Sequence, residues 1–209
     1  MKKFWMAIAL LSTFVLWTVA VRFVDVAPIG PNGSAVGFAT LNGWFHRLTG
    51  VHMSLYVLTD WLGLLPVAVC FAFAVMGLFQ WVRRKSIAKV DGDLLLMGGF
   101  YVLVLAAYLL FETIVINYRP VLIEGVLEAS YPSSTTLLTV CVLPAALVWL
   151  HRRTAPRWMV AFMVLFTAFM VFGRLFSGVH WLTDIIGGGL LGGGLTALYA
   201  ASCDRLNGR

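Results

Sequence analysis

Residues 173–188 read GRLFSGVHWLTDIIGG and connect the last two apolar runs of the chain. The stretch places three ionisable residues, Arg174, His180 and Asp184, among segments that are otherwise apolar. Ionisable residues at membrane depth are costly and by default indicate function. His180 and Asp184 are four residues apart, so they would lie on one face of a helix. There the carboxylate can accept one ring N–H and leave the other ring nitrogen free as a nucleophile.

The apolar runs around this stretch belong to a chain with too few charges to be soluble. Of its 209 residues, 61% are hydrophobic and 11% are charged, whereas a soluble domain has about 25% charged residues. A membrane-spanning helix needs about 20 predominantly apolar residues. Runs of that kind lie at residues 4–24, 56–82, 94–116, 134–150, 158–176 and 181–201. The sequence therefore predicts an all-α, polytopic membrane bundle of six transmembrane helices.

The distribution of lysine and arginine predicts how these helices are oriented. Eleven of the fifteen basic residues fall on one side of the predicted membrane: Lys2, Lys3, Arg83, Arg84, Lys85, Lys89, Arg152, Arg153, Arg157, Arg205 and Arg209. Because basic loops face the cytoplasm, we expect both termini on the cytoplasmic side of an inner or plasma membrane. The first run is longer than the apolar region of a typical signal peptide, so we expect a retained helix. The net charge of +6 then reflects topology and contact with the lipid bilayer, and no nucleic-acid motif accompanies it.

The segments outside the spans predict one domain over residues 1–209, with no internal repeat and no long linker. The outer segment 25–55 is rich in glycine, proline and asparagine. Its part LNGWFHRLTG is predicted to form a short helix in the membrane interface, with Trp44 and Phe45 as anchors.

Two further patterns are interpreted as packing features. The three cysteines, Cys70, Cys141 and Cys203, are far apart and read as small buried hydrophobes, neither a disulfide nor a metal site. The glycines of GGGLLGGG at 187–194 indicate close helix–helix contact.

Four arginines lie away from the predicted cytoplasmic side, and two of them suggest a phosphate site. Arg22 and Arg47 are interpreted as snorkelling residues at the interface. Arg119 and Arg174 end apolar helices beside other polar groups, and guanidinium groups match phosphate oxygens bidentately. The stretch YPSSTT at 131–136 opens a helix whose N-terminus can bind an anion. Each feature alone also has a structural interpretation, such as an N-cap, but all of them end on the same predicted face of the membrane.

These motifs resemble a known signature. Arg119-Pro120, Pro132-Ser133-Ser134 and Arg174-x5-His180-x3-Asp184 are similar to the three-part signature of the type-2 phosphatidic acid phosphatase superfamily, which is shared with vanadium haloperoxidases. The third part matches the family's spacing in full, although Gly173 stands where the family usually has serine. The resemblance covers residues 94–201, the last four helices, and implies a phosphatase-like core there, with residues 1–93 as two N-terminal helices and an outer interfacial segment.

The resemblance also implies roles for individual residues. His180 would be the nucleophile that forms a phosphohistidine, and Asp184 would orient it. Arg119 and Arg174 would clamp the phosphate oxygens, and the turn of Ser133, Ser134 and Thr135 would cradle them. It further implies a reaction at the extracytoplasmic face that needs neither a metal ion nor a cofactor.

Two departures from the family pattern bear on the chemistry. Glu112 stands where the first motif begins with lysine, and Thr135 stands where the second motif has the histidine that protonates the leaving group. A threonine hydroxyl cannot replace an imidazolium as a general acid near neutral pH. Three responses remain open: the substrate is a diphosphate, whose leaving group needs little protonation; another group, Glu112, His46 or His52, supplies the proton; or the site binds phosphate without cleaving it. We also expect Glu112 to form an ion pair with Arg119, two helical turns away.

The sequence thus favours a phosphohydrolase that acts on a membrane lipid phosphate, preferably a polyprenyl diphosphate of the undecaprenyl type in the cell envelope. A lipid-linked phosphotransferase and a non-catalytic lipid-phosphate binding protein or transporter are the alternatives. A channel is disfavoured, because the polar residues gather at one face and do not line a path through the membrane. Oligomeric state has no signature in the sequence.

Overall fold

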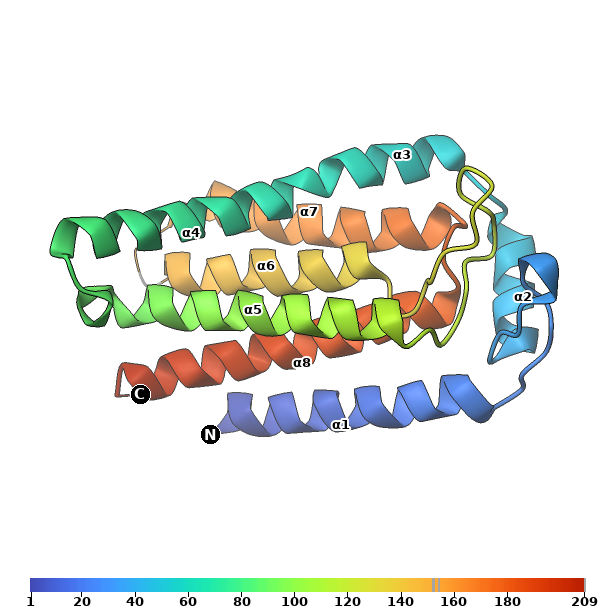
Figure 1. The fold of residues 1–209 in the computed structure, drawn as a ribbon, viewed down its shortest axis with the longest axis horizontal. Helices are drawn as coiled ribbons and strands as arrows, with labels where there is room; N and C mark the ends of the chain where they lie inside the picture. Colours follow the sequence, from blue (N-terminus) through green and yellow to red (C-terminus); the bar gives the residue numbers. More distant parts are fainter. Residues whose placement is uncertain (152, 154, 209) are drawn as a thin grey trace.

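The computed structural model describes residues 1–151, 153 and 155–208, and its elements are helices joined by short turns and loops (Figure 1). The helices are α1 (Lys2–Phe23), α2 (Ala39–Thr49), α3 (Met53–Leu62), α4 (Leu64–Arg84), α5 (Gly92–Thr113), α6 (Ser134–His151), α7 (Arg157–Phe176) and α8 (Leu182–Leu206). Single 3-10 turns lie at Pro31–Gly33 and Ile87–Lys89. All helices except α2 run roughly along the long axis of the molecule, and α2 lies across one end (Figure 1).

Within the described residues, six segments are long and apolar enough to cross a membrane, which confirms the predicted number. They are α1, α5, α6, α7, α8 and the combined segment Met53–Arg84, in which α3 and α4 meet at Gly63. The fourth span, α6, is the shortest of the six and contains Pro144. One boundary differs from the prediction. The third span ends at Thr113 and not at residue 116, and this earlier end affects the geometry of the site. The chain is therefore an integral membrane protein with an all-α fold.

Helix α8 is the central helix of the bundle. It is the most buried of the six spans and packs against α1, α5 and α6. Large apolar side chains on α1, α4, α5 and α7 instead point outward, among them Leu16, Phe71, Val102 and Leu165. Hydrocarbon is as apolar as these side chains, so contacts between membrane helices depend on close packing of small residues.

The glycines of α8 provide that close packing, as the sequence predicted. A Cβ atom on Gly194 would lie 2.8 Å from the side chain of Leu11 in α1, and one on Gly192 would lie 3.0 Å from Val140 in α6. A Cβ atom on Gly187 would lie 2.7 Å from the ring of Tyr131. That ring has no room to move, because its hydroxyl hydrogen-bonds to Thr18 at 2.7 Å and only 2% of the residue is exposed.

We expect Gly187→Ala to destabilise the protein and Gly189→Ala to leave its stability unchanged or slightly raised. Overpacking of this kind costs about 1–3 kcal/mol, whereas a Cβ atom on Gly189 meets nothing within 4 Å and alanine favours a helix over glycine by about 1 kcal/mol. The melting temperatures of both variants in one detergent test this. Equal melting temperatures would contradict tight packing at Gly187.

The two ends of the bundle differ in charge. Both termini, the end of α4 with the α4–α5 connection, and the end of α6 with the connection to the start of α7 lie at one end (Figure 1). Nine described basic residues of the predicted cytoplasmic set belong to those segments, and Arg152 and Arg209 lie outside the described residues. The other end holds α2, the loop 114–133 and the turn 177–181 (Figure 1). The polar motifs therefore do share one end of the bundle, whereas the side of the membrane that this end faces stays a prediction.

Candidate active site

His180 and Asp184 meet at the start of α8. His180 Nδ1 lies 3.7 Å from Asp184 Oδ2, and both side chains are almost completely buried. Asp184 lies in the first turn of the helix, where the helix dipole favours a negative charge. Its carboxylate also accepts hydrogen bonds from the Trp181 backbone N–H at 2.9 Å and from Asn117 Nδ2 at 3.2 Å. Asp184 is thus held rigidly and faces one ring nitrogen of His180.

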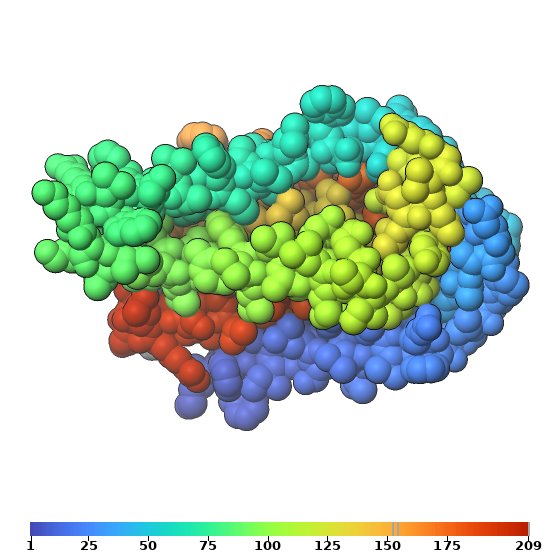
Figure 2. Space-filling model, viewed as in Figure 1, coloured from blue at the N-terminus to red at the C-terminus, as the bar shows by residue number. Residues whose placement is uncertain are grey.

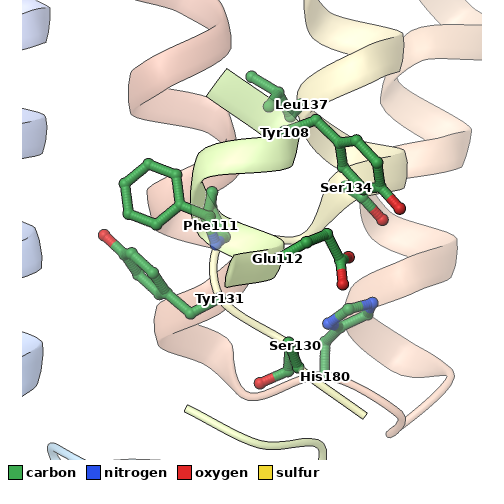
Figure 3. A pocket seen from close by; sticks show the side chains of 10 residues that line it. Tyr108, Phe111, Glu112, Ser130, Tyr131, Ser134, Leu137 and His180 are labelled. Carbon is green, nitrogen blue, oxygen red and sulfur yellow. The ribbon is translucent and has the colours of Figure 1, made fainter. Parts of the chain in front are cut away.

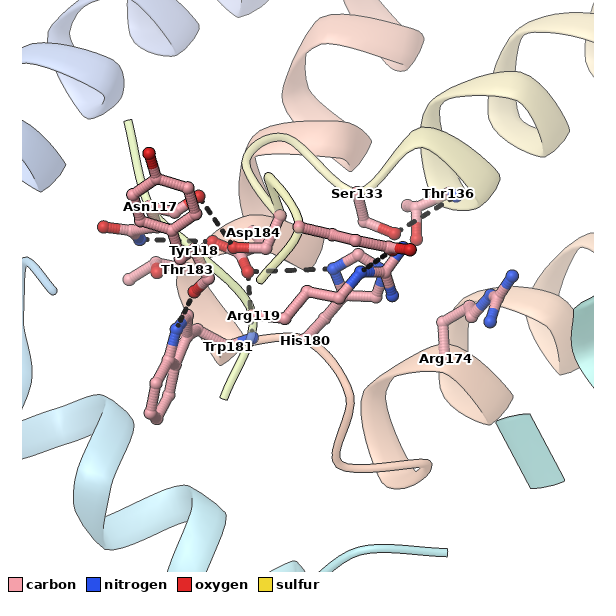
Figure 4. Close-up of polar contacts among 12 residues, drawn as sticks. Asn117, Tyr118, Arg119, Ser133, Thr136, Arg174, His180, Trp181, Thr183 and Asp184 are labelled. Atoms are coloured by element: carbon pink, nitrogen blue, oxygen red, sulfur yellow. Dashed lines mark hydrogen bonds and ion pairs between the residues drawn. The ribbon is translucent and has the colours of Figure 1, made fainter. Parts of the chain in front are cut away.

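The loop 114–133 carries Arg119 to the other ring nitrogen. Arg119 Nη1 lies 3.4 Å from His180 Nε2, and Figure 4 shows the guanidinium beside the imidazole. The loop folds back on itself, because the Arg119 backbone N–H donates to the carbonyl of Glu128 and the Ser130 N–H donates to that of Asn117. Trp181 Nε1 donates to the Tyr118 carbonyl at 2.7 Å. These bonds tie the loop to α8 and fix the position of Arg119.

The predicted ion pair between Glu112 and Arg119 is wrong. Helix α5 ends at Thr113, so the two residues do not lie on a common helix. Arg119 Nε instead lies 2.9 Å from Glu128 Oε2, within the folded-back loop. The prediction assumed that the helix continued for two more turns.

Glu112 lines a small pocket next to the nucleophile. It lies in the last turn of α5 and is exposed. The pocket also contains Tyr108, Ser130, Ser134 and His180. Figure 3 shows the carboxyl group of Glu112 pointing toward the His180 ring. Glu112 therefore adds a negative charge where the family pattern has a lysine.

The turn before His180 depends on a close approach of two backbone segments. Gly178 has φ +71°, and a Cβ atom there would lie 2.0 Å from the carbonyl oxygen of Gly50. His46 Nε2 contacts the Gly178 carbonyl oxygen at 3.2 Å, so α2 supports this turn. His52 Nε2 contacts the Thr49 carbonyl oxygen at 2.9 Å. Both histidines, which the sequence offered as replacement acids, contact backbone carbonyls near the turn.

The start of α6 presents the YPSSTT turn to the site. Ser133 is fully buried, and its backbone N–H donates to the Asp184 carbonyl at 3.0 Å. Its hydroxyl oxygen lies 3.5 Å from the Thr136 N–H, as expected of an N-cap. The amide of Ser133 is therefore already used, and the first free N–H groups of α6 are those of the next residues.

Arg174 is buried at the end of α7 and has a partner that the sequence did not predict. Its Nη2 donates to Thr135 Oγ1 and to Asp60 Oδ1, each at 2.7 Å. The Arg174 side chain is 2% exposed, whereas the Asp60 side chain is 61% exposed. Nε and Nη1 of Arg174 have no hydrogen-bond partner among the described residues. A guanidinium has five N–H donors, so three of them are available to an anion.

The Tyr56 ring lies near both arginines. The centre of its ring is 4.8 Å from the guanidinium carbon of Arg174 and 5.9 Å from that of Arg119. Both distances allow a cation–π interaction. The electron-rich face of one ring thus lies within reach of both positive charges.

An apolar cavity of about 550 Å³ reaches from this site into the membrane-spanning part of the bundle. Its wall is formed by α3, α4, α5 and α6, and Figure 2 shows an opening between the α3–α4 segment and α5, with α6 behind it. The lining residues include Leu64, Val67, Val104, Leu105, Leu138 and Val142. Asp60, Ser134 and Thr135 line its polar end. The cavity therefore connects the apolar interior of the bundle with Asp60 and Thr135, the two residues that hydrogen-bond to Arg174.

Burial lowers the pKa of His180 to about 4. The nearby carboxylate of Asp184 raises the pKa, and the charge of Arg119 lowers it further. The imidazole is consequently neutral near pH 7, as a nucleophile requires.

This lowered pKa predicts that the stability of the protein depends on pH. Since an unfolded histidine titrates near 6.5, the unfolded chain binds more protons than the folded chain between pH about 4 and about 6.5. Stability then rises with pH across that window and is level above it. We expect the melting temperature of wild type in detergent to rise more steeply from pH 4.5 to 6.5 than that of His180→Gln. Parallel curves would contradict a buried, neutral His180.

Comparisons with known proteins agree with this arrangement. The model of the PAP2 superfamily, the type-2 phosphatidic acid phosphatases, matches residues 116–207. We call this matched part of the chain the PAP2 region. It contains Arg119, the YPSSTT turn, Arg174, His180 and Asp184, so the resemblance inferred from the motifs is confirmed.

A solved structure extends the similarity beyond the PAP2 region. It is described as the first transmembrane PAP2 type phosphatidylglycerolphosphate phosphatase from Bacillus subtilis, and it is similar to this chain with a TM-score of 0.60 and 16% sequence identity over 96% of each chain. At that identity the likeness concerns the fold alone. No curated protein matches the chain in sequence.

Several residues of the site were missed by the sequence analysis. Asn117 and Glu128 lie in the loop, where no periodicity indicates which residues meet. Tyr56 and Asp60 lie outside the PAP2 region, on α3. Asp60 did carry a signal, because it is the only carboxylate within the apolar run 56–82.

Proposed function

We propose that the protein is a metal-independent phosphohydrolase that cleaves a membrane lipid phosphate through a phosphohistidine at His180. The observation that carries this proposal is the position of the His180 ring, with Asp184 at Nδ1 and Arg119 at Nε2. Nε2 is the nitrogen that would attack phosphorus, and the adjacent guanidinium would bind the phosphate oxygens. The apolar cavity beside Arg174 supports a lipid as the substrate, since its volume and lining suit an acyl or prenyl chain.

The reaction divides into two steps. His180 attacks phosphorus in line, while Arg119, Arg174 and the N-terminus of α6 stabilise the charge on the equatorial oxygens. Water then hydrolyses the phosphohistidine and restores the free imidazole. We place the site at the extracytoplasmic face, on the evidence of the basic residues at the opposite end of the bundle.

We further propose that a polyprenyl diphosphate is the preferred substrate. A general acid typically contributes roughly 10²–10⁴-fold to a rate, and Thr135 cannot supply a proton near neutral pH. An alkoxide is a poor leaving group, whereas a phosphate monoester, whose second pKa is about 6, leaves far more readily. A diphosphate therefore needs the least help from an acid.

Phosphate release by the purified protein tests the function. Wild type in detergent, in buffer with a chelator, is compared with His180→Ala on a polyprenyl diphosphate, a polyprenyl monophosphate and phosphatidic acid. We expect the fastest release from the diphosphate and none from the variant. Addition of an alcohol or sugar acceptor distinguishes a phosphotransferase, because the phosphoryl group then appears on the acceptor. Vanadate binding without release from any substrate would show a binding protein and would refute the proposal.

A further inference from the structure

Asp60 lies at the junction between the phosphate site and the apolar cavity. Its Oδ1 is 2.7 Å from Arg174 Nη2, the same nitrogen that donates to Thr135 Oγ1. Asp60 and Thr135 therefore approach the site from the same side, although one lies on α3 and the other on α6. Thr135 occupies the position at which the family motif has its proton donor, so Asp60 lies next to that position.

The side of the phosphate that faces the cavity is the side of the leaving group. If the lipid chain occupies the cavity, the oxygen that joins it to phosphorus must lie at the polar end of the cavity. Asp60, Thr135, Ser134 and Tyr108 line the cavity near that end. Of the described residues that line the cavity, Asp60 is the only one with a carboxyl group. Glu112 instead lines the pocket that contains the nucleophile.

We propose that Asp60 is a catalytic residue, the proton donor to the leaving oxygen, and that it replaces the histidine absent at Thr135. This inference rests on the proposed phosphohydrolase function. It adds a carboxylic acid from outside the PAP2 region to the machinery of that region.

Substrate binding releases Asp60 for this role. A phosphate group competes with the carboxylate for Arg174, and the three N–H groups of Arg174 without a partner strengthen its binding. Once the phosphate displaces it from Arg174, the Asp60 carboxyl can take from solvent the proton that it later donates. The exposure of its side chain, 61%, allows this exchange with solvent.

Proton transfer from Asp60 accompanies cleavage of the bond between phosphorus and the leaving oxygen. As His180 Nε2 forms a bond to phosphorus, the bond from phosphorus to the leaving oxygen breaks, and the carboxylic acid of Asp60 gives its proton to that oxygen. A lipid monophosphate substrate then releases a neutral lipid alcohol, and a lipid diphosphate releases a lipid monophosphate. In the second step the Asp60 carboxylate accepts a proton from the attacking water, the P–N bond breaks, and phosphate leaves.

The experiment compares substrates that differ in their leaving group, and it tests each substrate with wild type and with two variants. Wild type, Asp60→Asn and Asp25→Asn are assayed on dodecyl phosphate, 4-nitrophenyl phosphate and a polyprenyl diphosphate. Asp25 is a matched control, because it is an exposed aspartate at the same end of the bundle that hydrogen-bonds to the Thr40 backbone. Dodecyl phosphate expels an alkoxide and needs the acid, whereas nitrophenolate and a phosphate monoester leave without it.

We expect Asp60→Asn to lose about 10²–10⁴-fold on dodecyl phosphate and to keep its rate within several-fold on the other two substrates. Asp25→Asn should match wild type on all three. Introducing Thr135→His into Asp60→Asn should restore part of the lost rate on dodecyl phosphate, because the added imidazolium lies on the same side. The affinity for vanadate should not fall in Asp60→Asn, because the carboxylate that competes with the anion for Arg174 is replaced by a neutral amide.

Other outcomes overturn the inference. An equal loss on all three substrates would make Asp60 a support for Arg174 and not an acid, and no loss on dodecyl phosphate would exclude it from catalysis. A wild type that cleaves the diphosphate but neither monoester would refute the inference and leave the phosphohydrolase function intact. A wild type without any turnover would refute both.

Discussion

Replacing His180 by alanine should abolish phosphate release, by on the order of 10⁴–10⁶-fold, the range seen when a covalent nucleophile is removed from an enzyme. Nε2 of this residue belongs to a neutral imidazole and faces Arg119. The variant should still bind vanadate, because both arginines and the start of α6 remain. Release is measured on the polyprenyl diphosphate, and binding is measured by isothermal titration of vanadate.

A second histidine provides the control for this variant. His151 is exposed at the end of α6, at the far end of the bundle from the site. His151→Ala should retain full activity. Residual turnover in His180→Ala within a factor of ten of wild type would assign the nucleophile to another group.

Replacing Arg174 by glutamine should lower turnover by about 10³–10⁵-fold, the contribution of an arginine that stabilises a phosphoryl transition state. Arg174 is 2% exposed and joins Thr135 to Asp60. Glutamine keeps a hydrogen-bond donor at this place but removes the charge and the planar fork. Arg174→Lys should recover only part of the loss, since an ammonium group cannot bind two phosphate oxygens in the same geometry.

The control for Arg174 is Arg22, an exposed arginine at the end of α1. Arg22→Gln should leave turnover and vanadate affinity at the wild-type level. If Arg174→Gln lost turnover without any loss of vanadate affinity, Arg174 would act on the leaving group and not on the phosphate oxygens. Rates on the three substrates and titration of vanadate separate these two roles.

The sequence predicted those parts of the structure that follow from local pattern. Apolar length specified six spans, and the positions of the polar motifs at span ends predicted that they would meet at one end of the bundle. The expectation that His180 and Asp184 lie on one helix face was wrong, because α8 begins at Leu182 and His180 lies in the turn before it; the carboxylate nevertheless faces the ring at 3.7 Å. The glycine-rich run 187–194 predicted tight packing around α8, which the contacts of Gly187, Gly192 and Gly194 confirm.

The partners of the two arginines could not be predicted in this way. Arg119 binds Glu128 because the loop 114–133 folds back on itself, and loop pairing leaves no periodic signal. Arg174 binds Asp60 across two helices that are far apart in sequence. The lone carboxylate in an apolar run did indicate function, but only the fold shows which residue it meets.

The contact between the first and the last helix has a consequence for how the protein is made. Trp17 Nε1 on α1 donates to the Thr183 carbonyl at the start of α8, and Thr18 hydrogen-bonds to Tyr131 beside the phosphate cradle. Because α8 leaves the ribosome after α1, these contacts can form only once α8 has been made. The site that contains His180 and Asp184 is therefore assembled no earlier than the insertion of α8, long after α1 has entered the lipid.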